Sequence, residues 1–216
     1  MAQLPERLLE GYAAFKSGKF KSDSQRYEEL HDEGQKPDIM LIGCCDSRAT
    51  PSDIFNAGPG EMFVVRNVAN IVPAQNEQME GLHGTAAALE FAVNALKVKH
   101  IVIMGHGRCG GVAAYISEDM EPLSEGNYIG QWAAQLAPAD KPERLAGLNR
   151  PDLDHQGLLE RSSIMKSIEN LMSYGFVREA VVLGTLDLHG AWFDIRQGRL
   201  EYYDRDDRSF KTVEEA

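Results

Sequence analysis

The sequence predicts an α/β fold, in which a mostly parallel central sheet is flanked by helices, with an N-terminal helical arm and a C-terminal antiparallel strand extension. Short apolar runs typical of strands buried on both faces recur along the chain, and segments with helical periodicity lie between them. A length of 216 residues suits a single domain. We divide it into the arm (1–34), an α/β core (35–204) and a charged tail (205–216).

The arm is expected to form one or two helices, because apolar residues recur at helical spacing from Leu4 to Phe15. Gly18 is expected to interrupt this pattern, which covers residues 4–30. Four apolar runs in the core are the expected strands, at residues 39–43, 63–65, 101–104 and 180–184. Helices are expected over residues 81–97, 129–136 and 157–173.

The C-terminal part of the chain has the period-two pattern of half-buried strands. Residues 191–195 and 200–203 alternate in this way and predict an antiparallel hairpin around Gly198. The charged segment after Asp204 is expected to be loosely held, as chain ends often are.

Composition and charge limit the classes of function. Asp and Glu number 33 against 22 Lys and Arg, which gives a net charge of -11. This balance disfavours a nucleic-acid binder, whose affinity comes from neutralising phosphates. We expect no membrane association, since no apolar run approaches the length of about 18 residues that is needed to cross a bilayer. The N-terminus lacks a secretory pattern, so a cytoplasmic protein is expected.

Two predicted strands are followed by cysteine and histidine, which are residue types that commonly bind metals. The first continues as Cys44-Cys45-Asp46-Ser47-Arg48, and the other reaches His106 and Cys109. Because the carboxyl ends of parallel strands gather catalytic and ligand groups, we expect these residues to lie close together. His106, Cys109 and either Cys44 or Cys45 would make the three-ligand set of a catalytic zinc ion. The alternative is that the cysteines are small buried apolar residues.

Asp46 and Arg48 form a second informative pair. If the chain turns after the strand, the two side chains can pair directly, and a carboxylate held by a guanidinium stays ionised. Beside a metal, Asp46 could accept a hydrogen bond from bound water, or it could bind the metal itself and close the fourth position. An ordinary surface salt bridge is the alternative.

Two other functions fit parts of the same sequence. Residues 105–110 match the G-x-G-x-x-G pattern of dinucleotide-binding sites, but Glu125, at the distance of the expected ribose-binding acid, lies in a predicted loop. A zinc or redox-sensing protein could use Cys44 and Cys45, although such a closed site does not need the Asp46–Arg48 pair.

The sequence resembles the β-class carbonic anhydrases from about residue 8 to 203. The residues that carry the resemblance are Cys44-x-Asp46-Ser47-Arg48, His106-x-x-Cys109-Gly110-Gly111 and the segments 59–70 and 90–93. The resemblance implies one Zn²⁺ per subunit on Cys44, His106 and Cys109, with Cys45 unligated. It also implies reversible hydration of carbon dioxide to bicarbonate and a proton, by a zinc-bound hydroxide that the Asp46–Arg48 dyad orients. Hydrolysis of carbon disulfide or carbonyl sulfide on the same fold is the alternative.

The resemblance further implies a substrate pocket and an assembly. Gln35 and Phe63 match pocket residues of the plant-like branch, and Phe91 falls where that branch often has Tyr. Homodimers or homotetramers are implied, in which N-terminal helices cross onto the partner and pocket residues come from across the interface.

One branch of this family has a Trp–Arg–Tyr set that binds a regulatory bicarbonate. Here the three positions are Leu41, Arg66 and Phe193, so only the arginine is kept and we expect no such site. His83 is a candidate for proton transfer to buffer, because an unperturbed imidazole titrates near neutral pH. A structural role at a helix start is the favoured interpretation of His83.

Overall fold

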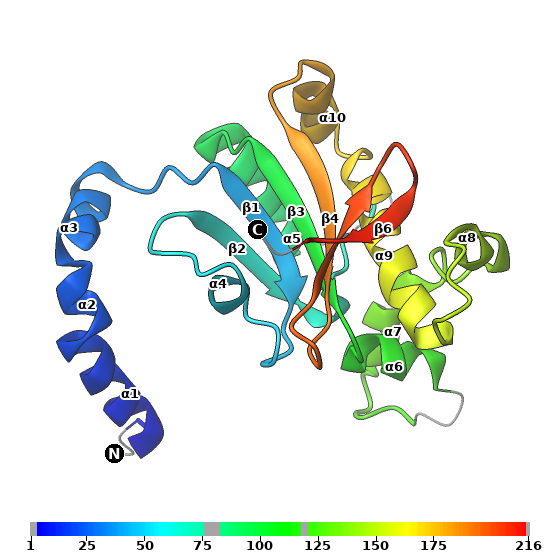
Figure 1. Cartoon of the computed structure of the whole chain (residues 1–216), viewed down its shortest axis with the longest axis horizontal. Helices are drawn as coiled ribbons and strands as arrows, with labels where there is room; N and C mark the ends of the chain where they lie inside the picture. The colour runs from blue at the N-terminus through cyan, green and yellow to red at the C-terminus, as the bar shows by residue number, and fades with distance from the viewer. Residues whose placement is uncertain (1–3, 76–82, 118–120, 215–216) are drawn as a thin grey trace.

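The computed structural model describes residues 4–75, 83–117 and 121–214, and it contains a six-stranded sheet (Figure 1). The strands follow the order β2 (Met62–Asn67), β1 (Ile39–Cys44), β3 (His100–His106), β4 (Asp187–Phe193), β5 (Leu200–Asp204) and β6 (Ser209–Thr212). The first four are parallel to one another, whereas β5 is antiparallel to β4 and β6 is antiparallel to β5. The prediction of a mostly parallel sheet with a C-terminal antiparallel extension is therefore confirmed.

One face of the sheet carries the main apolar core. The elements that pack there are α5 (Gly84–Glu90), the π-helical turn η2 (Phe91–Leu96), α9 (His155–Leu171) and α10 (Gly175–Val182). Met40 and Ile42 of β1 point into this core, whereas Leu41 points to the other face, beside the short helix α4 (Pro51–Ile54). Because β1 has neighbours on both edges and side chains packed on both faces, its continuous apolar run was a reliable strand signal.

A second group of helices lies at the carboxyl end of the sheet. It comprises η1 (Val68–Asn70), α6 (Gly110–Ile116), α7 (Tyr128–Ala133) and η3 (Ala134–Leu136), while α8 (Pro142–Gly147) packs on α9. The predicted helices at 129–136 and 157–173 are confirmed with shifted ends. The one predicted at 81–97 corresponds to α5 and η2; its first two residues lie outside the described residues.

The fourth predicted strand was wrong. Residues 180–184 include the end of α10 and the turn after it, and the fourth strand is β4, which begins at Asp187. A short apolar run does not distinguish a strand from a helix. In α10 the burial is one-sided, since Val177 is fully buried whereas Val182 is 77% exposed.

The C-terminal tail contains a strand that the sequence did not predict. The hairpin of β4 and β5 is confirmed, but the chain then turns again, and β6 pairs with β5. Phe210 of β6 lies opposite Tyr203, with ring centroids 5.3 Å apart. This aromatic cross-strand pair holds part of the tail that we expected to be loose.

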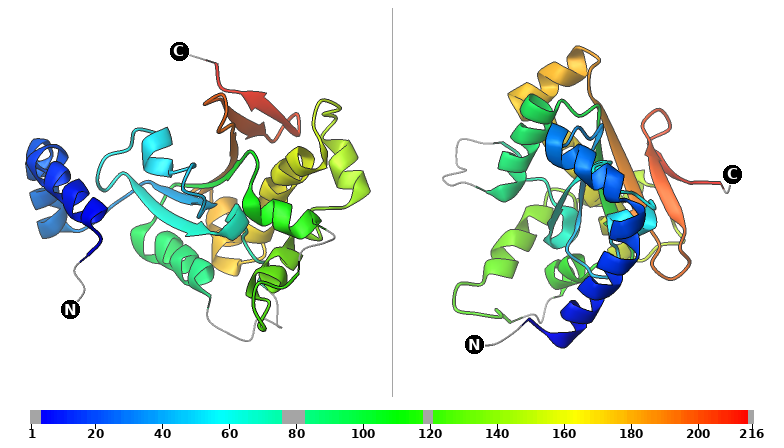
Figure 2. Two further views of the ribbon diagram at one scale, coloured as in Figure 1. Left: turned by 90° about the horizontal axis from the view of Figure 1, so that it is seen from below. Right: turned by 90° about the vertical axis from the view of Figure 1, so that its left-hand side faces the viewer.

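The N-terminal arm consists of α1 (Glu6–Ser17), α2 (Lys19–Ser22) and α3 (Ser24–Glu33), and Gly18 interrupts it as predicted. Figures 1 and 2 show that the arm extends beyond the β2 edge of the sheet. None of the described residues of these three helices is buried. The arm therefore exposes apolar side chains such as Leu8 and Tyr12. Within the described residues, no helix is long and apolar enough to cross a membrane.

Candidate metal centre

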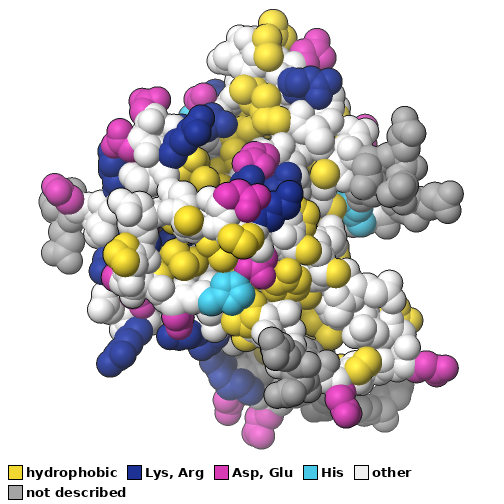
Figure 3. Space-filling view, turned by 90° about the vertical axis from the view of Figure 1, so that its right-hand side faces the viewer, with side chains coloured by type: hydrophobic (Ala, Val, Ile, Leu, Met, Phe, Trp, Pro, Cys, Tyr) yellow, Lys and Arg dark blue, Asp and Glu magenta, His cyan; other side chains and the backbone are white. Residues whose placement is uncertain are grey.

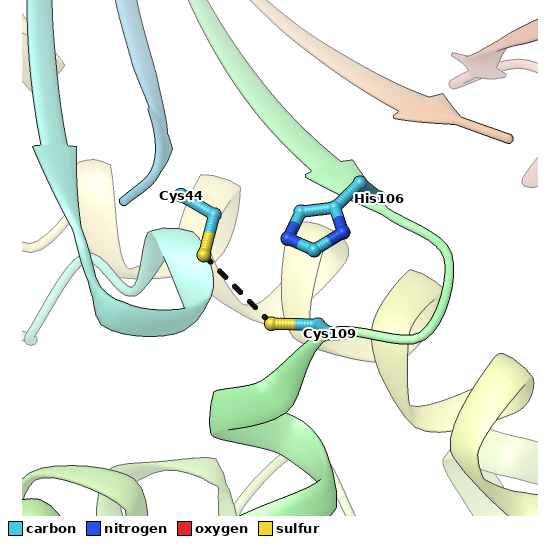
Figure 4. Close-up of side chains that lie close together, drawn as sticks. All are labelled: Cys44, His106 and Cys109. Carbon is cyan, nitrogen blue, oxygen red and sulfur yellow. Dashed lines mark hydrogen bonds between the residues drawn. The ribbon is translucent and has the colours of Figure 1, made fainter. Parts of the chain in front are cut away.

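Three metal-binding side chains meet at the carboxyl ends of two neighbouring parallel strands. Cys44 is the last residue of β1, His106 is the last residue of β3, and Cys109 precedes the first turn of α6. All three are buried, and their ligand atoms lie within 4.8 Å of one another (Figure 4). Cys45 is exposed and lies outside this cluster, so the structure distinguishes the two adjacent cysteines that spacing alone left open.

The distances in the cluster fit a zinc ion. The Sγ atoms of Cys44 and Cys109 are 3.9 Å apart, too far for a disulfide. Two sulfurs bound to tetrahedral zinc at about 2.3 Å each lie about 3.8 Å apart. The Nδ1 atom of His106 is 3.0 Å from the carbonyl oxygen of Gly107, to which it can donate a proton. This leaves the buried Nε2 atom, which has no hydrogen-bond partner among the described residues, to bind a metal.

Glycine at position 111 lets α6 approach η1 closely. A Cβ atom at Gly111 would lie 2.6 Å from Cγ1 of Val68 and 3.0 Å from Cβ of Ala69. The neighbouring Gly110 has no atom within 4 Å of its position for a Cβ. The close approach at Gly111 therefore sets the position of the helix that follows Cys109.

The two buried thiols lie close enough for one to stabilise the thiolate form of the other. The contact with the Cys109 thiol, together with the neighbouring imidazole of His106, lowers the pKa of Cys44 to about 4 against the opposing effect of burial. The hydrogen bond to the Cys44 thiolate and burial raise the pKa of Cys109. Since thiolates are the metal-binding form, a cation that enters this cluster displaces the remaining proton.

Arg48 holds the carboxylate of Asp46 in a fixed orientation beside the cluster. Asp46 Oδ1 accepts hydrogen bonds from the backbone N–H and Nε of Arg48 at 3.0 and 2.9 Å, and Oδ2 accepts one from Nη2 at 2.7 Å. These bonds hold the pKa of Asp46 well below its usual range. Asp46 Oδ2 lies 3.8 Å from Nε2 of His106. An ionised carboxylate therefore faces the place where the three ligand atoms converge.

Arg66 fastens the loop that joins Cys44 to Asp46. Its Nε donates to the carbonyl oxygen of Cys44 at 2.7 Å, and its Nη2 donates to that of Asp46 at 2.6 Å. The sequence presented Arg66 only as the remaining member of a regulatory set. The other two positions carry the apolar side chains of Leu41 and Phe193, and the absence of a regulatory bicarbonate site stays a prediction.

Glu160 is a buried carboxylate that sequence reasoning missed. Its Oε1 accepts the backbone N–H of Cys109 at 3.0 Å and Nε2 of Gln156 at 3.1 Å, and its Oε2 accepts the indole N–H of Trp192 at 3.2 Å. Burial raises the pKa of Glu160, and these hydrogen bonds oppose that shift. Glu160 thus ties a residue of the metal cluster to α9 and β4.

The network continues through the next residue of α9. Arg161 is fully buried, stacks over the ring of Trp192 at 3.6 Å and pairs with Glu201 of β5 at 2.8 Å. The sequence offered only the adjacent charged residues Glu160 and Arg161 within the predicted helix at 157–173. The structure shows that both are buried, and buried charges are paired.

The structure does not bring the three predicted pocket residues to the metal cluster of the same chain. Gln35 is exposed on the loop before β1, at the end of the strand opposite to Cys44. Phe63 of β2 pairs with Met40, also near that end, and its ring lies 5.8 Å from the ring of Phe91. Their roles as pocket residues stay predictions.

His83 has a structural role in the described chain. It precedes α5, and its Nδ1 accepts the backbone N–H of Ala86 at 3.1 Å. Burial lowers the pKa of His83.

Glu125 lies in a turn rather than at a strand end, which disfavours the dinucleotide hypothesis. On the face drawn in Figure 3, basic and acidic side chains are interspersed.

Comparisons with known proteins agree with this centre. The carbonic anhydrase family model matches residues 39–200. The chain is 38% identical over 184 residues to β-carbonic anhydrase 5, chloroplastic, and 35% identical over 191 residues to β-carbonic anhydrase 6, mitochondrial, both of Arabidopsis thaliana. These matches cover 85% and 88% of this chain, which spans only 59% and 64% of the respective relatives.

Solved structures of β-carbonic anhydrases share this fold over most of the chain. The β-carbonic anhydrase CcaA is 28% identical with a TM-score of 0.82, over 97% of this chain and 92% of that one. A tetrameric β-carbonic anhydrase of Sordaria macrospora is 31% identical with a TM-score of 0.75, over 91% and 94%. The family match extends over both strand ends that build the cluster, and the chain belongs to the β-class carbonic anhydrases.

Proposed function

We propose that this chain is a zinc-dependent carbonic anhydrase, which catalyses the reversible hydration of carbon dioxide to bicarbonate and a proton. The observation that carries the proposal is the Cys44–His106–Cys109 cluster with the carboxylate of Asp46 fixed beside it by Arg48. Membership of the β class supports the same activity.

Cys44, Cys109 and His106 would hold the zinc ion. When bound, zinc supplies a Lewis acid that lowers the pKa of a coordinated water towards 7. Two thiolates and a neutral imidazole balance the charge of Zn²⁺, so the pull on the water is weaker than with three neutral histidines. The protein groups that position the attacking water therefore contribute more to the rate.

Asp46 is the group that orients this water. Because its carboxylate is ionised, it only accepts hydrogen bonds, and Oδ2 is the oxygen nearest to the cluster. A water that donates one hydrogen bond to Asp46 keeps a lone pair free for the carbon of carbon dioxide. Arg48 holds the carboxylate in this direction, and its Nη2 also donates to the carbonyl oxygen of Arg108 at 3.1 Å.

We propose that the functional unit is a homodimer or a homotetramer of the arm, core and tail described above. The unburied arm supports this, as does the exposed edge strand β2 with the adjacent Phe91. Gln35, Phe63 and Phe91 would then complete the partner's pocket, with the two aromatic rings as an apolar wall. A β-carbonic anhydrase of Sordaria macrospora is tetrameric. Sedimentation velocity tests the proposal, and a monomer would contradict it.

A reducing compartment such as the cytoplasm suits this site. The thiols of Cys44 and Cys109 bind a metal only while they stay reduced, and their separation of 3.9 Å would allow oxidation after a small movement. We therefore propose a cytoplasmic location.

The activity is tested by stopped-flow hydration of carbon dioxide with the zinc-loaded protein. Asp46→Asn should keep zinc and lose most turnover, because the amide presents a donor as well as an acceptor to the water. Asp53→Asn, at an exposed position of α4, is the matched control and should behave as wild type. A fully active Asp46→Asn variant would contradict the mechanism. Release of sulfide from carbonyl sulfide, without hydration of carbon dioxide, would favour the alternative hydrolase.

A further inference from the structure

Two histidines far from the metal centre lie against each other at the amino ends of β3 and β4. His100 is the first residue of β3, and His189 is the third residue of β4. In the register of these parallel strands, His100 lies beside Asp187, and Val102 lies beside His189. Since alternate residues of a strand share a face, the two histidines and Asp187 project from the same face of the sheet.

The spacing of the two rings fits a shared metal ion. Nδ1 of His100 is 3.2 Å from Nε2 of His189, and the same Nδ1 is 3.8 Å from Oδ2 of Asp187. Two imidazole nitrogens bound to tetrahedral zinc at about 2.0–2.1 Å each lie about 3.4 Å apart. Small rotations of the two rings would therefore direct both lone pairs at one ion.

The surroundings allow a cation to enter. The side chains of His100 and Asp187 are 42% and 72% exposed, so water can fill the remaining coordination positions. Burial lowers the pKa of His189, with His100 and Arg205 acting in the same direction and Asp187 opposing them. The imidazole of His189 is accordingly neutral at neutral pH and offers a lone pair. The charge of Arg205 opposes a cation at this place, and the carboxylate of Asp187 offsets it.

We propose that His100 and His189 form a second metal site for a divalent transition ion of the zinc class, with water in the remaining coordination positions and the carboxylate of Asp187 beside it as a counter-charge. Imidazole ligands suit such ions. The site is separate from the catalytic centre, because His106 ends the strand that His100 begins, about 20 Å away at about 3.3 Å per residue. A bound ion joins β3 to β4 at their amino ends, so it stabilises the sheet and leaves catalysis unchanged.

The competing explanation is a hydrogen bond between two imidazoles, which needs no ion. Equilibrium dialysis of the zinc-loaded protein against micromolar zinc chloride, followed by measurement of zinc per chain, separates the two. Wild type should hold two equivalents, whereas His100→Ala and His189→Ala should each hold one. His31→Ala, which removes an exposed histidine of α3, is the matched control and should hold two.

Two further readouts make the result independent of folding defects. The single equivalent left in His100→Ala and His189→Ala should support wild-type turnover, which shows that the catalytic centre has formed. Excess zinc should raise the melting temperature of wild type and of His31→Ala, and it should not raise that of either pair variant. A wild-type protein that binds one equivalent, or a His100→Ala variant that keeps the second, would overturn the proposal and leave the proposed function unaffected.

Discussion

Replacement of Glu160 by alanine should weaken both the fold and the metal centre. The change removes the acceptor for two buried donors, the backbone N–H of Cys109 and the indole N–H of Trp192. An unsatisfied buried donor costs about 1–3 kcal/mol, so the two together cost about 2–6 kcal/mol. Burial raises the pKa of Glu160, which means that burying its charge is unfavourable. Removing the carboxylate therefore offsets part of this cost. We expect a net loss of about 2 kcal/mol, which lowers the melting temperature of a chain of this length by about 4–8 °C.

Thermal unfolding of the zinc-loaded protein measures this effect, and the rate of zinc loss to a chelator measures its consequence for Cys109. Glu160→Gln keeps one carbonyl oxygen as acceptor, so it should lie between wild type and Glu160→Ala in both assays. Glu179→Ala, at an exposed position of α10, is the control. Its free energy of unfolding should lie within about 0.5 kcal/mol of that of wild type. If Glu160→Ala melts and releases zinc as wild type does, the hydrogen bonds of Glu160 do not position the metal loop.

Two other substitutions test the surroundings of the centre. Arg48→Ala should retain zinc but lose about 10- to 100-fold in turnover, because Asp46 is no longer held. A carbon-13 NMR titration of this variant should show the pKa of Asp46 rising towards about 3.9, so that Asp46 takes up its proton at higher pH than in wild type. An unchanged titration would show that Arg48 does not hold the carboxylate ionised. Gly111→Ala should cost about 1–3 kcal/mol in unfolding experiments, since its Cβ would clash with Val68, whereas Gly110→Ala should cost little. Equal stability of the two glycine variants would show that the close approach of α6 is not required.

The fold was predictable where burial is symmetrical. β1 and β3 are surrounded by apolar side chains on both faces, so their sequences are continuous apolar runs. β4 was missed in its first half because Asp187 and His189 face solvent there, while the apolar run before it ends a helix. Strand β6 was missed because it lies in a charged segment without an apolar pattern. Its pairing with β5 includes the contact between Phe210 and Tyr203.

The metal cluster was predictable because short stretches of sequence place its members at the ends of neighbouring strands. The rule that carboxyl ends of parallel strands meet was enough to bring His106 and Cys109 together with Cys44 or Cys45, and the choice of Cys44 came from the family resemblance. Glu160 was not predictable in this way, since it reaches the backbone of Cys109 from a helix 51 residues further along the chain. Gln35 is exposed at the end of β1 opposite to Cys44, and its role in a pocket stays a prediction.

The proposed activity depends on one imidazole and two of the three cysteines holding a zinc ion with a position free for water. X-ray absorption at the zinc K edge of His100→Ala, which lacks the proposed second site, tests this directly. We predict two sulfurs at about 2.3 Å and light atoms at about 2.0–2.1 Å, with both sulfurs retained in Cys45→Ser and one lost in Cys44→Ser. A sulfur shell that shrinks in Cys45→Ser, or a shell without sulfur, would contradict it.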